Sequence, residues 1–185
     1  MNTNLYRVLI LLCCLLVARP APAAGIEIRS AASRLVADNY LLDADLAFNF
    51  DPEVVEALEH GVAITIDIII VVKRVRNWLW DPKIKRETIS FRLEQHPLSN
   101  LYLVTEISSD IKRQFQTLPE ALAYLGNIEG RILINQSALS ADAKYVGIIK
   151  AKVNTETLPV VIRPEAAVSK KWQLDSPWRE WVIKE

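Results

Sequence analysis

Hydrophobic and polar residues alternate with a period of two over much of the chain. Alternation begins at Ile26 and continues to about Val36, and a second alternating segment runs from Leu42 to Phe50. This pattern is typical of strands that bury one face and expose the other. Similar patterns predict further strands over residues 89–93, 101–107, 128–134, 145–153 and 160–162.

The segment Val62–Val72 is apolar at both odd and even positions. Its many β-branched residues favour a strand over a helix. We therefore predict a central strand that is buried on both faces. It continues through Lys73–Arg76 to a turn near Asp81 and Pro82, and the chain then returns antiparallel.

Two short helices interrupt the strands. Asp51 and Gly61 are placed to begin and end the first, and Thr117–Glu120 has the pattern of a capping box for the second, Pro119–Leu125. An isoleucine-rich strand follows each helix. This repeated order is explained by two similar halves or by chance reuse of good helix formers.

These elements predict an all-β fold, an antiparallel β-sandwich or a strongly curved sheet with two short helices. Helical crossovers are too few for a parallel α/β fold. An α+β fold is the alternative. One domain is expected over residues 24–185.

The N-terminus has the pattern of a secretory signal peptide covering residues 1–23. Arg7 precedes the apolar run Val8–Ala18, and small residues precede a cleavage site after Ala23. The run is shorter than the roughly 20 apolar residues that a spanning helix needs. We therefore expect cleavage and a periplasmic location in a bacterium, with an uncleaved anchor as the alternative.

Composition narrows the chemistry. The 22 basic and 22 acidic residues give no net basic field, so nucleic acid is not an expected partner. Both cysteines, Cys13 and Cys14, lie in the predicted signal peptide. The exported chain would therefore contain no disulfide, no catalytic thiol and no cysteine-bound zinc.

Residues suited to catalysis are few. His60 and His96 lie beside turns, and no spacing supplies a third metal ligand. Asp43 and Asp45 share a strand face and could form a glycosidase-like pair of carboxylates. The same pattern is typical of an ordinary polar face that is exposed to solvent. No glycine-rich phosphate loop occurs. The sequence thus predicts a non-enzymatic protein without metal or cofactor.

The hairpin 73–86 is the strongest candidate for partner binding, because six basic residues and two tryptophans surround one turn. Arginine and tryptophan dominate binding hot spots. We predict that Arg74, Arg76, Trp78 and Trp80 contact a partner. The alternative is that the tryptophans cover the end of the sandwich while the charges keep an edge strand from aggregating.

The C-terminal segment 172–183 contains Trp172, Trp178 and Trp181. The spacing of Trp178, Trp181 and Val182 fits a helix, and a final strand fits equally well. The tail either packs on the sandwich or forms an exposed docking segment.

Several motifs together resemble a family of exported proteobacterial proteins known only as a domain of unknown function. They are Glu56–Val62, Arg76–Asp81, Phe91–Ser99, Leu118–Leu122 and the tryptophan-rich end. The resemblance implies no catalytic residues. Family members are often encoded near a sensor kinase of the nitrogen-regulation type, which implies an envelope accessory to signalling.

Three hypotheses follow. The first is a periplasmic interaction module that contacts the outer domain of an envelope or membrane protein. The second is a carrier of lipid or another apolar ligand, suggested by Val62–Val72. The third, a glycan hydrolase, rests on Asp43 and Asp45 and is the weakest.

Overall fold

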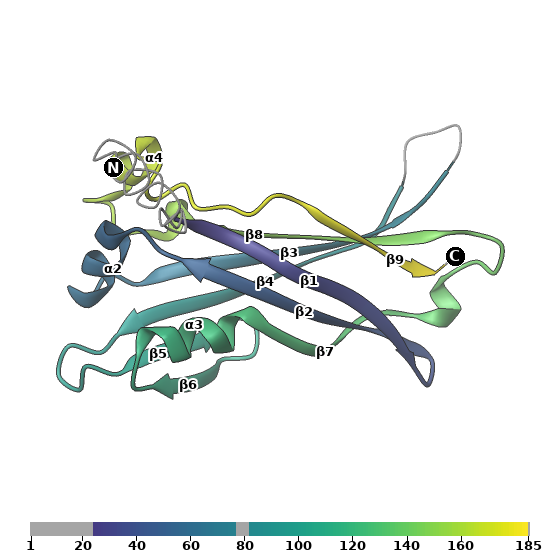
Figure 1. Ribbon diagram of the computed structural model, residues 1–185, viewed down its shortest axis with the longest axis horizontal. Coiled ribbons are helices and arrows are strands. Elements are labelled where there is room, and N and C mark those ends of the chain that lie inside the picture. Colours follow the sequence, from purple (N-terminus) through teal and green to yellow (C-terminus); the bar gives the residue numbers. More distant parts are fainter. Residues whose placement is uncertain (1–23, 77–81, 185) are drawn as a thin grey trace, which may run out of the picture.

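The computed structural model describes residues 24–76 and 82–184, which form two antiparallel sheets (Figure 1). The strands are β1 (Gly25–Val36), β2 (Asn39–Asn49), β3 (Ile64–Arg74), β4 (Lys83–Gln95), β5 (Tyr102–Glu106), β6 (Ile111–Phe115), β7 (Asn127–Asn135), β8 (Tyr145–Val153) and β9 (Arg179–Lys184). The helices are α2 (Pro52–Glu59), α3 (Leu118–Gly126) and α4 (Arg163–Val168), with 3-10 turns η1 (Gln136–Ala138) and η2 (Thr155–Thr157). No helix within these described ranges is long and apolar enough to cross a membrane.

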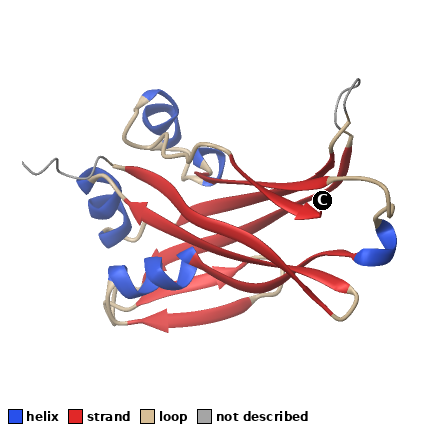
Figure 2. Cartoon of the chain, turned by 45° about the vertical axis from the view of Figure 1, so that its right-hand side comes forward, coloured by secondary structure: helices blue, strands red, loops and turns tan. Residues whose placement is uncertain are grey.

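The smaller sheet has the order β1-β2-β7 and the larger has the order β6-β5-β4-β3-β8-β9. Every hydrogen-bonded pair of strands is antiparallel. The two sheets lie over one another, with α2, α3 and α4 toward one end and the 3-10 turn η1 at the other (Figure 2). This confirms the predicted all-β, sandwich-like fold. Helix α2 connects the smaller sheet to the larger one, and α3 returns the chain to the smaller sheet.

The hydrophobic core lies between the sheets and is built from alternate residues. Strand β3 contributes Ile66 and Ile68, which are fully buried, and β2 contributes Leu42 from the facing sheet. Strand β3 has three paired strands on one side and two on the other, so it is the predicted central strand. Its burial on both faces is also confirmed.

Both predicted helix starts are confirmed by their caps. The Asp51 carboxylate accepts a hydrogen bond from the Glu53 amide (3.1 Å), and the Thr117 hydroxyl accepts one from the Glu120 amide (3.4 Å). Helix α3 ends at Gly126. A Cβ atom there would lie 2.1 Å from the carbonyl oxygen of Leu46, so glycine allows α3 to approach β2 closely.

Two expectations change in the last third of the chain. The predicted strand 160–162 is wrong, because these residues form a turn that leads into α4. Pro164, in the first turn of α4, favours the start of a helix, and this outweighs the strand preference of the three β-branched residues. The C-terminal choice between helix and strand is resolved as strand β9, which pairs with β8.

An ionic network joins the two sheets beside β7. The Arg131 guanidinium contacts the carboxylates of Glu87 (2.7 Å) on β4 and Glu106 (2.9 Å) on β5. Lys85 binds Glu87 (2.9 Å) and donates to the Leu133 carbonyl (2.7 Å). Burial opposes ionisation of Glu87, but hydrogen bonds from Lys85 and Arg131 outweigh it and hold its pKa below the usual value. Burial likewise opposes ionisation of Glu106, and hydrogen bonds dominated by Arg131 lower its pKa.

Candidate functional site

The outer face of the larger sheet carries an apolar strip outside the core. Val71 on β3 is directly opposite Arg86 on one side and Ile148 on the other. Side chains directly opposite one another point to the same face of a sheet. Val71, Ile148 and Ile69 are nevertheless buried. Long side chains lie on the same face, with Arg86 opposite Val71 and Lys150 opposite Ile69, and their aliphatic stems can lie on an apolar floor.

A pocket of about 430 Å³ lies on this strip. Val71 and Ile148 are its apolar residues. Its polar and aromatic lining comes from β3, β4 and the segment around β9: Lys73, Lys83, Arg86, Trp178 and Glu180. Three cations face one carboxylate here, so the pocket has a local excess of positive charge.

Trp178 is the aromatic wall of the pocket. It immediately precedes β9, and 52% of its surface is exposed. The Lys150 ammonium lies 5.9 Å from the ring centroid and is also ion-paired with Asp175 at 2.5 Å. The indole therefore stands among cations, with its ring available for contact.

The predicted site residues fall into three groups. Arg74 is on the opposite face of β3 from Lys73, by the alternation of the strand, and is half-buried opposite Tyr145. Arg76 is exposed beyond the end of β3. Trp78 and Trp80 lie outside the described residues. The structure therefore does not bring Arg74 to the pocket.

The three C-terminal tryptophans have different environments. Trp172 is buried and donates from its indole nitrogen to Glu53 on α2 (3.1 Å). Trp181 is buried against Gly147, where a Cβ atom would lie 2.2 Å from the ring. Only Trp178 of these three is exposed. Sequence reasoning missed that Trp178 lines the same pocket as Lys73, Lys83 and Arg86. Strand parity, which separates Trp178 from Trp181, was the usable signal.

The candidate carboxylate pair has arginine partners. Asp43 contacts Arg34 (2.6 Å) and accepts a hydrogen bond from the Gly130 amide (2.8 Å), whereas Asp45 is 3.8 Å from Arg29. The hydrogen bond from Arg34 is the main cause of a lowered pKa at Asp43. A glycosidase acid needs a raised pKa, so this environment does not suit Asp43 to that role.

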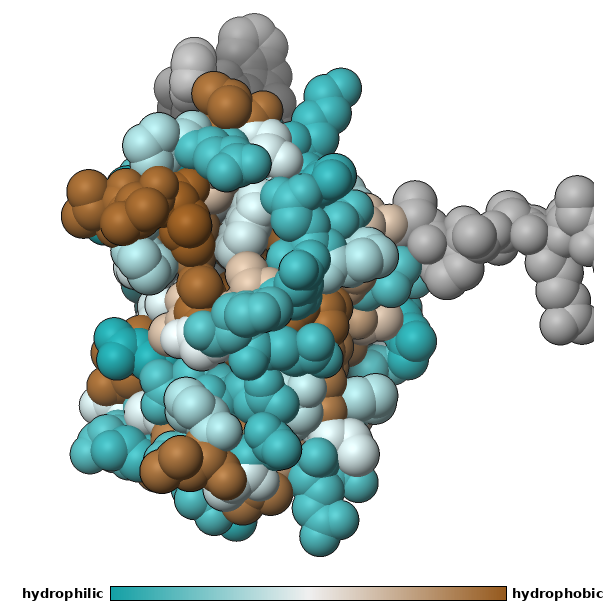
Figure 3. All heavy atoms as spheres, turned by 90° about the vertical axis from the view of Figure 1, so that its left-hand side faces the viewer, coloured by the Kyte–Doolittle hydropathy of each residue, from teal (hydrophilic) through white to brown (hydrophobic). Residues whose placement is uncertain are grey.

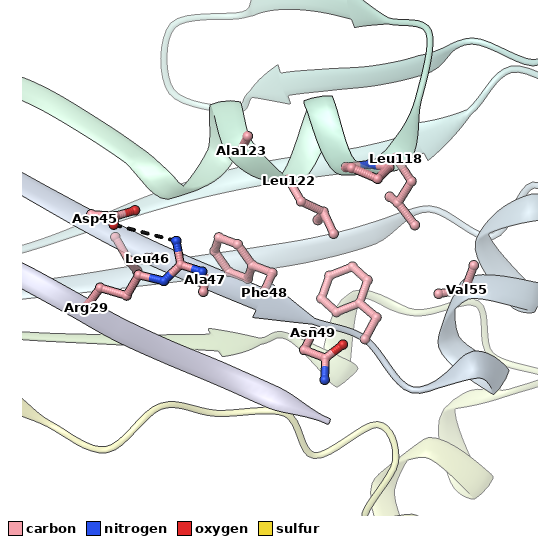
Figure 4. A pocket seen from close by; sticks show the side chains of 12 residues that line it. Arg29, Asp45, Leu46, Ala47, Phe48, Asn49, Val55, Leu118, Leu122 and Ala123 are labelled. Atoms are coloured by element: carbon pink, nitrogen blue, oxygen red, sulfur yellow. Dashed lines mark ion pairs between the residues drawn. The ribbon is translucent and has the colours of Figure 1, made fainter. Parts of the chain in front are cut away.

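A second hollow lies between β2, α2 and α3. It has a volume of about 460 Å³. Phe48, Leu118 and Leu122 point into the same space, with Val55 across from them (Figure 4). The Arg29–Asp45 pair lies at one end of this groove.

Fold and sites together define the class of protein: an antiparallel β-sandwich with a basic, tryptophan-walled pocket on the outer face of its larger sheet. The model of a family described as a domain of unknown function, DUF4390, matches residues 23–182. The chain belongs to this family. No curated protein and no solved structure matches it.

Proposed function

We propose that the protein is an exported, non-enzymatic interaction module that binds an acidic surface of an envelope or membrane protein. The binding surface is the outer-face pocket formed by Lys73, Lys83, Arg86 and Trp178. Export is supported by the signal-peptide pattern of residues 1–23 and by cysteines confined to that segment.

One observation carries this proposal. The exposed tryptophan of the C-terminal segment and the cations of the 73–86 hairpin, far apart in sequence, line one pocket. A half-exposed tryptophan over an apolar floor supplies contact area, and the cations supply charge complementarity. An exposed tryptophan beside several cations is typical of a binding hot spot for an acidic partner.

The test is crosslinking in the cell from a position beside the pocket. A photoreactive residue at Val182, 55% exposed on β9, should capture a specific acidic envelope protein. The same photoreactive residue placed at Ile132, which is 58% exposed on β7, is the control and should not capture this protein.

Charge reversal then tests the pocket itself. Lys83→Glu with Arg86→Glu should abolish the Val182 product and lower affinity for the identified partner at least about tenfold. Lys112→Glu with Arg113→Glu, an equal reversal on exposed β6, should leave the product unchanged. Unchanged capture by a folded pocket variant would refute this placement of the site.

A second candidate function, carriage of an apolar ligand, is favoured by the groove beside α3. Its lining of Phe48, Leu118 and Leu122 suits an acyl or aromatic group. Native mass spectrometry of protein isolated from its own envelope should then show a bound mass. Leu122→Trp should remove that mass, and Leu35→Trp on the exposed β1–β2 tip should retain it. A ligand-free wild-type mass would reject the carrier hypothesis.

A further inference from the structure

Three valines project from the segment around α4. Val160 is 74% exposed, Val161 is 91% exposed and Val168 is 80% exposed. Single exposed apolar residues are ordinary, but these three occur within one turn and the short helix after it.

The segment that carries these valines is firmly attached to the fold. Ala166 in α4 and Leu158 before the turn are both fully buried. Arg163 donates two hydrogen bonds to the Leu158 carbonyl, at 2.8 and 3.2 Å. The valines are therefore held in the solvent by a fixed scaffold.

The location of this segment in the domain indicates which kind of surface the valines contact. Trp172 and Lys171, just after α4, both bind Glu53 on α2. Strand β1 starts at the same end, because Gly25 pairs with Asn49 just before α2. The described chain therefore begins at the end where the exposed valines lie (Figure 1), and the apolar run Val8–Ala18 precedes this start in the sequence.

A flat surface in contact with this end of the domain would touch other exposed apolar residues besides those of the α4 segment. Leu98, 93% exposed in the turn between β4 and β5, lies at the same end. Figure 3 looks onto this end and shows hydrophobic side chains protruding near its top and near its bottom. The end of β3 and the start of β4, which carry Lys73 and Lys83, lie at the opposite end of the domain (Figure 1).

We propose that the α4 end of the domain rests on a lipid bilayer, with Val160, Val161 and Val168 inserted at the interface. This rests on the export step of the proposed function, which brings the apolar run Val8–Ala18 to a membrane, but not on the basic pocket. The contact is aliphatic, so it resists salt, unlike the charge-driven pocket. It would leave the end of β3 and the start of β4 directed away from the bilayer.

A fluorescent probe tests this whether the N-terminal segment is cleaved or kept. Cys13 and Cys14 are replaced by alanine, and an environment-sensitive dye is attached to a single cysteine at Val161 in the full chain as the cell exports it. On vesicles of phosphatidylethanolamine and phosphatidylglycerol, the emission should shift to the blue and be quenched by lipid-borne quenchers, even at high salt. The same dye at Ile132 is the matched control and should not respond.

Substitution supplies the second measurement. Val160→Asp with Val168→Asp should abolish the dye response at Val161 and weaken vesicle binding by roughly tenfold per valine. Capture by the basic pocket should be unaffected, which separates this inference from the proposed function. An unresponsive dye at Val161, an equal response at Ile132, or a shift that follows protein concentration without vesicles would overturn the proposal.

Discussion

The two faces of β3 are similarly buried, but only the inner face belongs to the core between the sheets. Ile68 faces inward and belongs to the core between the sheets. Its neighbour Ile69 is 8% exposed and lies outside that core, opposite Lys150 and Thr88. An apolar residue of this strand can thus be buried within the core between the sheets or on the outer face, next to side chains with long aliphatic stems.

This difference separates stability from binding. Core side chains are held by packing on all sides, so removing one leaves a cavity. Lysine and arginine stems can move aside for a partner, and their charges remain at the surface. We therefore expect substitutions on the inner face to change mainly the free energy of unfolding, and substitutions on the outer face to change mainly binding.

The largest expected effect compares adjacent residues. Ile68→Ala should lower the free energy of unfolding by about 2–5 kcal/mol, because the core cannot fully collapse around the lost atoms. Ile69→Ala should cost only about 1 kcal/mol, because flexible stems can fill the space. Urea denaturation of both variants measures this, and equal losses would contradict the distinction between the faces.

A substitution on β8 that adds a methyl group tests how tightly the inner face of the larger sheet is packed. Gly147→Ala should destabilise the protein by roughly 1–3 kcal/mol, because the new methyl group overlaps the Trp181 ring. Gly25→Ala is the control, since a Cβ atom at Gly25 meets nothing within 4 Å. Thermal unfolding of the two variants should differ clearly; a neutral Gly147→Ala would mean that Trp181 is easily displaced.

The outer face should show the reverse behaviour. Trp178→Ala should change the free energy of unfolding by no more than about 1 kcal/mol, because the indole is half-exposed. It should nevertheless weaken binding of the identified partner by about 2 kcal/mol or more. Calorimetric titration beside a denaturation curve checks both values. A large loss of stability with unchanged affinity would make Trp178 a structural residue.

The smallest effect concerns the ionic network at the rim of the core. Because folding lowers the pKa of Glu87 and Glu106, their contribution is present above the ordinary glutamate pKa and is lost as pH falls through the folded pKa. Arg131→Met should flatten this acid-side dependence by about 1 kcal/mol, since the groups are only partly buried. Denaturation across the acid range measures the slope, and an unchanged slope would exclude Arg131 as its cause.

Local patterns predicted the elements because strand parity and helix caps are properties of neighbouring residues. The caps at Asp51 and Thr117 and the two-sided burial of β3 needed only the sequence around them. The incorrect strand prediction for residues 160–162 shows where local patterns are insufficient. Three β-branched residues near Pro164 are compatible both with a strand and with a turn before a helix. The two tryptophans of the predicted site, Trp78 and Trp80, remain predictions.

The sequence by itself determined an antiparallel β-protein with a central apolar strand, and drew attention to a basic hairpin and a tryptophan-rich tail. Only the tertiary structure decided that Trp178 joins Lys73, Lys83 and Arg86 while Trp172 and Trp181 are buried. The physical reason is that β3 and β9 both pair with β8. Hydrogen bonding between strands distant in sequence determines which side chains share a face, and no local pattern contains that pairing.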